Sequence, residues 1–234
     1  MKIRTLALNS LALTTLIMLS ACGGGGSDSG TVAATVSFPL LAGNAARIIS
    51  GASDRFTISG TCTGTGSTTT SKPISSNFEG VTGYSVGQTA NLTLTNCTPA
   101  SNTISATTYF DSTYTLLGVD IPNTRYEKFA TQPPPPLPTS VKVGDTAVYA
   151  TLTLYTNSTK SVVTGQHVLS YVVETDTSST ALITLITKEY NTSNQLTLTQ
   201  LAKYRIGADG TLSVLSIDQQ GSLTNTTHLV WTKV

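Results

Sequence analysis

Charged residues are scarce in this sequence of 234 amino acids. Asp, Glu, Lys and Arg make up 11% of it, whereas a typical globular protein has about 25%. The 13 basic residues are scattered rather than clustered, and nucleic acids are held by clustered Lys and Arg. The sequence therefore predicts no nucleic-acid partner.

Residues that commonly carry catalysis are also few. The chain has two histidines, His167 and His228, and no GxSxG motif of the kind that presents a catalytic serine. Each histidine lies in a predicted strand beside apolar residues, which favours a hydrogen-bonded structural role. We therefore expect no catalytic residues, no metal site and no cofactor. An enzyme whose site has no local sequence signature remains an alternative.

One pair of carboxylates could in principle serve a glycosidase. Glu174 and Asp176 are two residues apart, so they share one face of a predicted strand. They lie at the mouth of a predicted turn, which favours solvated turn charges instead.

Long apolar runs are missing as well. The run from Leu6 to Leu19 contains several polar residues and falls short of the roughly 20 residues that span a bilayer. Lys2 and Arg4 precede it, and this order is typical of an export signal peptide. We therefore expect residues 1–21 to be a removed signal peptide rather than a membrane helix.

The end of this run carries the most specific motif of the chain, Leu19-Ser20-Ala21-Cys22, followed by four glycines. It resembles the lipobox of bacterial lipoproteins. The resemblance implies cleavage before Cys22 and acylation of its sulfur, so that the membrane becomes a partner through Cys22. Residues 22–35 would be the lipid anchor and a flexible tether. The alternative is an ordinary cleavage site with an incidental cysteine.

The same resemblance predicts a location in the cell envelope. Gly23, rather than Asp, follows the cysteine, which resembles lipoproteins sorted to the outer membrane where the source has two membranes.

The other two cysteines are Cys62 and Cys97. In an exported chain such a pair is typically a disulfide. A redox or metal pair would favour CxxC spacing or a nearby histidine, and neither is present in the sequence.

The missing charge is replaced largely by threonine, which occurs 44 times. Threonine is β-branched and favours pleated, half-buried surfaces. Alternating apolar and polar residues recur along much of the chain. We predict an all-β fold of antiparallel meander strands that form a sandwich or a half-barrel. The segments 36–41 and 46–50 read as strands, residues 63–73 as an exposed loop, and no stretch as a convincing amphipathic helix.

A proline-rich stretch, TQPPPPLPT, divides the mature sequence. Consecutive prolines cannot donate to a sheet ladder and hold the chain extended. We interpret residues 131–140 as a connector between an N-terminal β module with the disulfide, 36–130, and a C-terminal antiparallel β meander, 141–234.

Within the meander, alternation predicts which side chains face the core. In one strand these are Val148, Ala150, Leu152 and Leu154. In a later strand they are Leu196, Leu198, Ala202, Tyr204 and Ile206. Leu201 has the opposite parity, so we expect it on the outer face or beside a bulge near Gln200.

Aromatic residues are densest just before the connector. The candidate interaction surface consists of Tyr109, Phe110, Tyr114, Tyr126 and Phe129. Packing between strands is the alternative explanation of this cluster.

The sequence favours a lipid-anchored cell-envelope protein with a non-catalytic interaction or structural role. Its partner would be an envelope protein, a glycan or an apolar ligand. The alternative is a periplasmic carrier that holds an acyl chain or another apolar ligand in a β half-barrel. A filled core would favour the first function, and a deep apolar cavity would favour the carrier.

Overall fold

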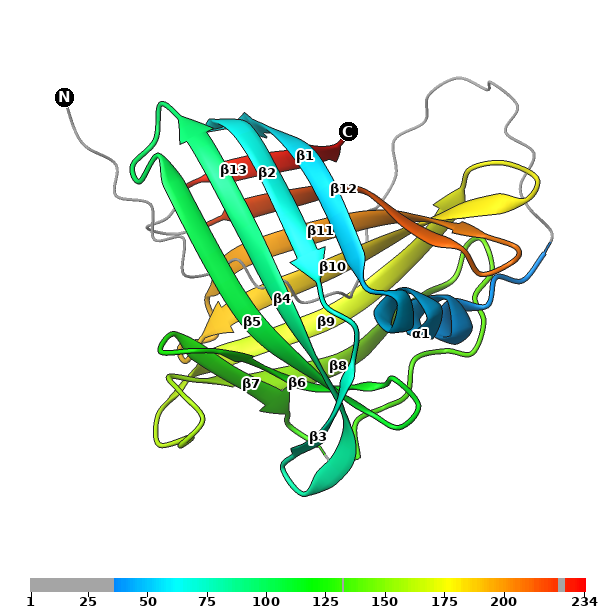
Figure 1. Cartoon of the computed structure of the whole chain (residues 1–234), viewed down its shortest axis with the longest axis horizontal. Coiled ribbons are helices and arrows are strands. Elements are labelled where there is room, and N and C mark those ends of the chain that lie inside the picture. Colours follow the sequence, from blue (N-terminus) through cyan, green and yellow to red (C-terminus); the bar gives the residue numbers. More distant parts are fainter. Residues whose placement is uncertain (1–35, 132, 223–225) are drawn as a thin grey trace.

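Thirteen strands form one antiparallel sheet, and twelve of them close into a barrel (Figure 1). The computed structural model describes residues 36–131, 133–222 and 226–234. The expected signal peptide, lipobox and tether lie outside these residues. No helix in these three ranges is long and apolar enough to cross a membrane.

From β3 to β13 each strand pairs with the next strand in the sequence, and β1 pairs with β2. The elements are α1 (Leu40–Ser50), β1 (Ala52–Gly60), β2 (Thr63–Thr70), β3 (Ile74–Phe78), β4 (Val81–Thr95), β5 (Ser101–Asp111), β6 (Leu116–Ile121), β7 (Arg125–Phe129), β8 (Thr146–Tyr155), β9 (Val163–Thr175), β10 (Thr180–Asn191), β11 (Leu196–Gly207), β12 (Leu212–Gly221) and β13 (His228–Lys233). β1 pairs with β13, and β2 pairs with β4, so the barrel has no open edge there. β3 pairs with β4 as an additional strand.

The prediction of an all-β antiparallel meander is confirmed, in the form of a closed barrel. The division into two β modules does not correspond to two sheets. β7 and β8 flank the proline-rich connector and pair directly with each other, with Phe129 opposite Leu152. Leu137 of the connector is buried in the main core. The strands of both expected modules therefore enclose one interior.

The predicted inward faces are confirmed for most positions of β8 and β11. Leu152, Leu154, Leu198, Ala202 and Ile206 are buried. The partly exposed Leu201 has the outward parity.

The prediction that Val148 faces the core is wrong, because its side chain is 63% exposed. The register of β8 against β9 shifts between Val148 and Ala150. This bulge inverts the alternation, so that Tyr149 packs against the core instead.

The segments 36–41 and 46–50 were expected to be strands, but residues 40–50 form α1. Leu40, Asn44 and Ile48 are buried, and their spacing of four places them on one face of a helix. Alanines at positions 42, 45 and 46 favour the helix. α1 therefore lies with one side against the barrel (Figure 1).

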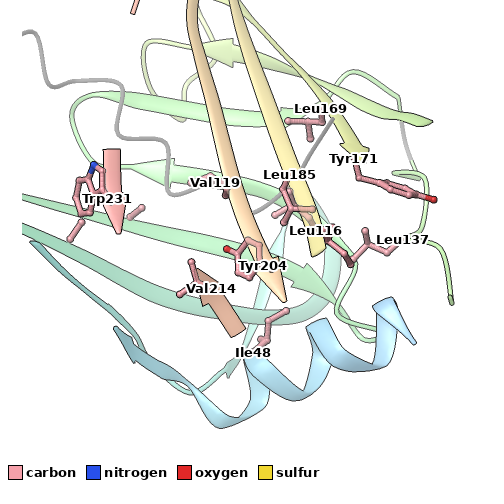
Figure 2. Packing of buried hydrophobic residues seen from close by; sticks show 14 of the residues in the cluster. Ile48, Leu116, Val119, Leu137, Leu169, Tyr171, Leu185, Tyr204, Val214 and Trp231 are labelled. Atoms are coloured by element: carbon pink, nitrogen blue, oxygen red, sulfur yellow. The ribbon is translucent and has the colours of Figure 1, made fainter. Parts of the chain in front are cut away.

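A close backbone approach fixes α1 on the barrel. A Cβ atom at Gly43 would lie 2.3 Å from the carbonyl oxygen of Gly210, in the turn between β11 and β12. Ile48 points from α1 toward Tyr204 and Val214 (Figure 2). The helix thus covers one end of the barrel interior, where Leu40, Ile183 and Leu212 also meet.

The prediction of an exposed loop over residues 63–73 is also wrong, because residues 63–70 form β2. Its pattern has glycine rather than a large apolar residue at inward positions. A Cβ atom at Gly66 would lie 2.8 Å from the ring of Trp231. The buried Trp231 of β13 fills the space that a β2 side chain would otherwise occupy.

The expected disulfide between Cys62 and Cys97 is present. Cys62 follows β1 and is buried, whereas Cys97 follows β4. Asn96 has a φ of 61°, which fits the turn that inward placement of Cys97 requires. The disulfide lies beside the β2–β4 seam, where the sheet closes.

Candidate functional site

Four charged side chains meet inside the barrel, and we call them the buried charge network. Arg125 and Glu127 come from β7, His167 from β9 and Glu189 from β10. The alternation of each strand places them inward, because Glu127 shares its parity with Phe129, and His167 shares its parity with Leu169. α1 lies near the start of β10, whereas Glu189 lies near its end. The network therefore belongs to the opposite part of the interior.

His167 lies between the two carboxylates. Its Nδ1 is 3.1 Å from Oε2 of Glu127, and its Nε2 is 3.1 Å from Oε2 of Glu189. Glu127 and His167 are 0% exposed.

Arg125 adds a second cation. Its Nε is 2.8 Å from Oε1 of Glu127, and its Nη1 donates a hydrogen bond of 2.8 Å to Oε2 of Glu189. Thr197 of β11 donates a hydrogen bond of 3.0 Å to the other oxygen of Glu189. Two cations and two anions thus balance within one hydrogen-bonded group.

The charged groups of the network shift one another's pKa values. Burial alone would raise the pKa of Glu189, but the hydrogen bond from His167 and the charge of Arg125 hold it at about 2. Burial likewise opposes ionisation of Glu127, yet the charges of His167 and Arg125 lower its pKa. For His167, burial lowers the pKa, whereas the charge and hydrogen bond of Glu127 outweigh this and raise it. The raised pKa favours the imidazolium form of His167, in which both ring nitrogens donate to the carboxylates.

This arrangement favours stability and strand registration over catalysis. A general base needs a free ring nitrogen within hydrogen-bond reach of a substrate. Both nitrogens of His167 already bond to carboxylates, and its side chain is fully buried. The network instead joins β7, β9 and β10 through charged side chains in the barrel interior, and the hydroxyl of Thr197 links it to β11.

The pKa shifts of the network predict a pH window of maximum stability. The pKa of Glu189 lies below its ordinary value of 4.5, so its contribution is present above that pH and is lost as the pH falls toward 2. The pKa of His167 lies above its ordinary value of 6.5, so its contribution is complete below 6.5 and is lost as the pH rises through the folded value. Urea unfolding across the pH range should therefore give the highest free energy of unfolding between these limits.

His167→Gln provides the control for the alkaline side of this profile. The variant has no imidazolium at this position, so the decline of its unfolding free energy above pH 6.5 should disappear. The acidic decline should remain, because Asp54, Glu79 and Asp176 also have lowered pKa values. Parallel alkaline limbs in the two proteins would contradict the assignment to His167.

The sequence pattern predicts a hydrogen-bonded His167 but not the other three members of the network, of which Glu127 and Glu189 bond to it. The sequence signal for these residues is a charged side chain at a strand position where the alternation predicts a core-facing residue. Glu189 follows Ile183, Leu185 and Thr187 in that parity.

The other histidine and the turn carboxylates have partners on the surface. Nε2 of His228 is 2.9 Å from Oδ1 of Asp218. Glu174 pairs with Lys203 at 3.3 Å, and Asp176 pairs with Arg205 at 2.6 Å. Glu174 and Asp176 thus form separate ion pairs beside the β9–β10 turn. Among the described residues no group of three or more His, Cys, Asp or Glu side chains is placed to hold a metal ion.

The five aromatic residues of the candidate interaction surface do not form one patch. Phe110 and Phe129 are buried in the main core. Tyr109 and Tyr126 pack with Phe78, at ring-centroid distances of 4.6 Å and 5.5 Å. Tyr114 stacks on Tyr84 at 5.0 Å. Packing between strands therefore accounts for this cluster.

Phe78 is part of a clamp on the outer face of β6 and β7. A Cβ atom at Gly118 would lie 2.4 Å from its ring. The adjacent Glu79 accepts hydrogen bonds from Tyr126, Lys128 and Lys160 at 2.7, 3.0 and 2.6 Å. The hydrogen bond from Lys160 is the main reason why the pKa of Glu79 is about 2. These aromatic contacts and hydrogen bonds thus hold the turn between β3 and β4 against the outer face of the barrel.

Comparison with protein-family models, with curated proteins and with solved structures gives no significant match in any of the three.

Proposed function

We propose that this protein is a lipid-anchored component of the bacterial cell envelope that binds another envelope component through the outside of its barrel. The filled interior of the barrel is the observation that favours this function over that of a carrier. One continuous core includes side chains from α1 and from the strands around the barrel. The cavity beneath α1 has a volume of about 60 Å³, whereas sites for drug-sized ligands typically measure about 300–1,000 Å³.

The lipobox resemblance supports the anchoring part of the proposal. Leu19-Ser20-Ala21-Cys22 would place acyl chains at the N-terminus of the mature chain, and two or more chains give stable membrane attachment. Residues 22–35 would then separate the barrel from the membrane surface. The outer faces of the strands are rich in threonine, whose hydroxyl groups can hydrogen-bond to a protein or a glycan.

Cys22→Ser tests the anchor. In a bacterial host that processes lipoproteins, the wild-type chain should fractionate with membranes, and its N-terminal peptide should carry acyl chains by mass spectrometry. Cys22→Ser should either appear in the soluble fraction or remain uncleaved. Ser27→Ala, in the expected tether, is the matched control and should behave as wild type. A cleaved Cys22→Ser chain that still fractionates with membranes would contradict lipid anchoring.

The interaction is tested by cross-linking in intact cells and pull-down of the full chain. One partner should recur with wild type and be lost when surface threonines of a single strand face are replaced by lysine. Replacement on the opposite side of the barrel is the control. A partner retained by all such variants would contradict recognition through the barrel wall.

The carrier alternative predicts a different result. Titration of the full chain with a fluorescent fatty acid would then show saturable binding of one molecule per chain. Because the cavity beneath α1, of about 60 Å³, is far too small for a fatty acid, we expect no saturable signal. Stoichiometric binding would replace the interaction proposal by the carrier.

A further inference from the structure

The cavity of about 60 Å³ lies between α1 and the inner wall of the barrel. It is lined by residues of α1, β1, β2, β4, β5, β11 and β12. Phe56, Val86, Phe110, Val214 and Ile217 form its apolar wall. Thr68, Thr70 and Ala52 line it from half-buried positions, so the cavity extends toward the surface. One water molecule needs about 10–15 Å³ of such space, so a single organic molecule of four to six heavy atoms fits.

Three buried polar side chains on this cavity, Tyr204, Gln88 and Asn44, have donor groups without a protein partner in the part of the chain that the structure describes. Tyr204 is 5% exposed, Gln88 7% and Asn44 8%. Gln88 accepts a hydrogen bond from Thr108 through Oε1, which leaves its NH₂ group unpaired. The hydroxyl of Tyr204 points to the side on which Val214 lies (Figure 2). Because these donor groups line a cavity that extends toward the surface, they can donate hydrogen bonds to an occupant.

The charges beside the cavity favour a negative occupant. Asp54 is buried and accepts hydrogen bonds from Arg47 and Lys233, each at 2.6 Å. Both cations thus share one carboxylate, which leaves one positive charge in excess. Arg47 lines the cavity, and only one of its N–H groups has a hydrogen-bond partner among the described residues. An anion here would meet a guanidinium and several neutral donors.

We propose that this cavity is a binding site for a short-chain carboxylate, a monoanion of the size of acetate to butyrate. Its carboxylate accepts hydrogen bonds from Tyr204, Asn44 and Gln88 beside Arg47. Its alkyl part lies against Phe56, Phe110 and Val214. α1 forms one wall of the site, so the helix contributes both a binding residue and the cover. This site is separate from the outer surface assigned to the envelope partner.

Isothermal titration of the full-length protein in mild detergent tests the proposal. The probes are sodium acetate, propionate and butyrate, with propionamide as the uncharged analogue at matched ionic strength. Butyrate should bind at one site per chain and more tightly than acetate, because its alkyl part buries more apolar surface. Propionamide should bind at least about tenfold more weakly than propionate, because it lacks the charge.

Tyr204→Phe removes one hydroxyl and should weaken butyrate binding about tenfold. Tyr171→Phe, a buried tyrosine that does not line the cavity, is the matched control and should bind as wild type. Val214→Phe should fill the site and abolish binding, and circular dichroism checks its fold. Water alone in the cavity, seen as no heat with any probe, would overturn the proposal. Equal binding of propionate and propionamide, or equal loss in both tyrosine variants, would overturn it as well.

Discussion

Glu127→Gln should lower the free energy of unfolding by about 3–5 kcal/mol, which is the usual cost of breaking a buried ion pair from one side. The substitution keeps the shape of the side chain and removes its charge. His167 and Arg125 would then share only Glu189, and one buried positive charge would remain uncompensated. Urea unfolding at pH 6 measures the effect where the network of the wild type is fully charged.

A double substitution separates charge balance from the loss of individual contacts. In Glu127→Gln with His167→Gln, the remaining Arg125 and Glu189 carry opposite charges and stay 2.8 Å apart. The double variant should therefore lose less stability than the sum of the two single variants. Glu174→Gln is the surface control, because Glu174 pairs with Lys203 at a half-exposed site, and it should change stability by less than about 1 kcal/mol. Additive losses, or equal losses at 127 and 174, would contradict the network.

The regular half of the fold could be predicted because its alternation is strong. β9, β10 and β11 place apolar residues at many alternate positions, interrupted by inward polar residues such as His167 and Gln200, and short turns separate the strands. The turn at residues 208–210 joins β11 to β12 as its Asp-Gly sequence suggests. A period of two leaves few alternatives for such segments.

Barrel closure could not be predicted from local pattern. It depends on β1 pairing with β13, which brings Phe56 opposite Lys233 from the far end of the chain. It also depends on β2, whose Gly66 sits inward because Trp231 fills the space beside it. A glycine such as Gly66 gives no apolar signal at an inward position, so the sequence of β2 resembles that of a loop. The side chain that fills the core at this position is Trp231, which belongs to β13.

The helix was missed for a different reason. The sequence 40–50 contains isoleucines and a glycine, which weaken a helical reading. The buried face of α1 is completed by Asn44, which lines the cavity together with Tyr204 and Gln88. A polar residue on the core face breaks the apolar pattern of an amphipathic helix. Asn44, which belongs to the proposed carboxylate site, is thus also the residue that hides α1 from a sequence-based prediction.

Ile183→Asp on the inner wall should lower the free energy of unfolding by several kcal/mol or prevent folding. Ile183 is 0% exposed, and its cross-strand partners are Val173 and Tyr204. Neither of these two partners carries a charge that would compensate an aspartate. Leu152 is equally buried but stands opposite His167, whose positive charge would offset part of the cost there.

The graded and matched variants make this result interpretable. Ile183→Val removes one methylene and should cost about 0.5–1.5 kcal/mol. Thr184, the next residue on the outer face, stands opposite Lys203 and contacts Glu174. Because both charges lie at a solvent-accessible site, Thr184→Asp should change stability by less than about 1 kcal/mol. Thermal unfolding of the three variants compares the two faces of β10 directly. Because neighbouring residues of one strand share backbone and sequence context, similar losses at 183 and 184 would mean that β10 does not separate a filled interior from solvent. The filled interior, and with it the argument against an acyl-chain carrier, would then have to be rejected.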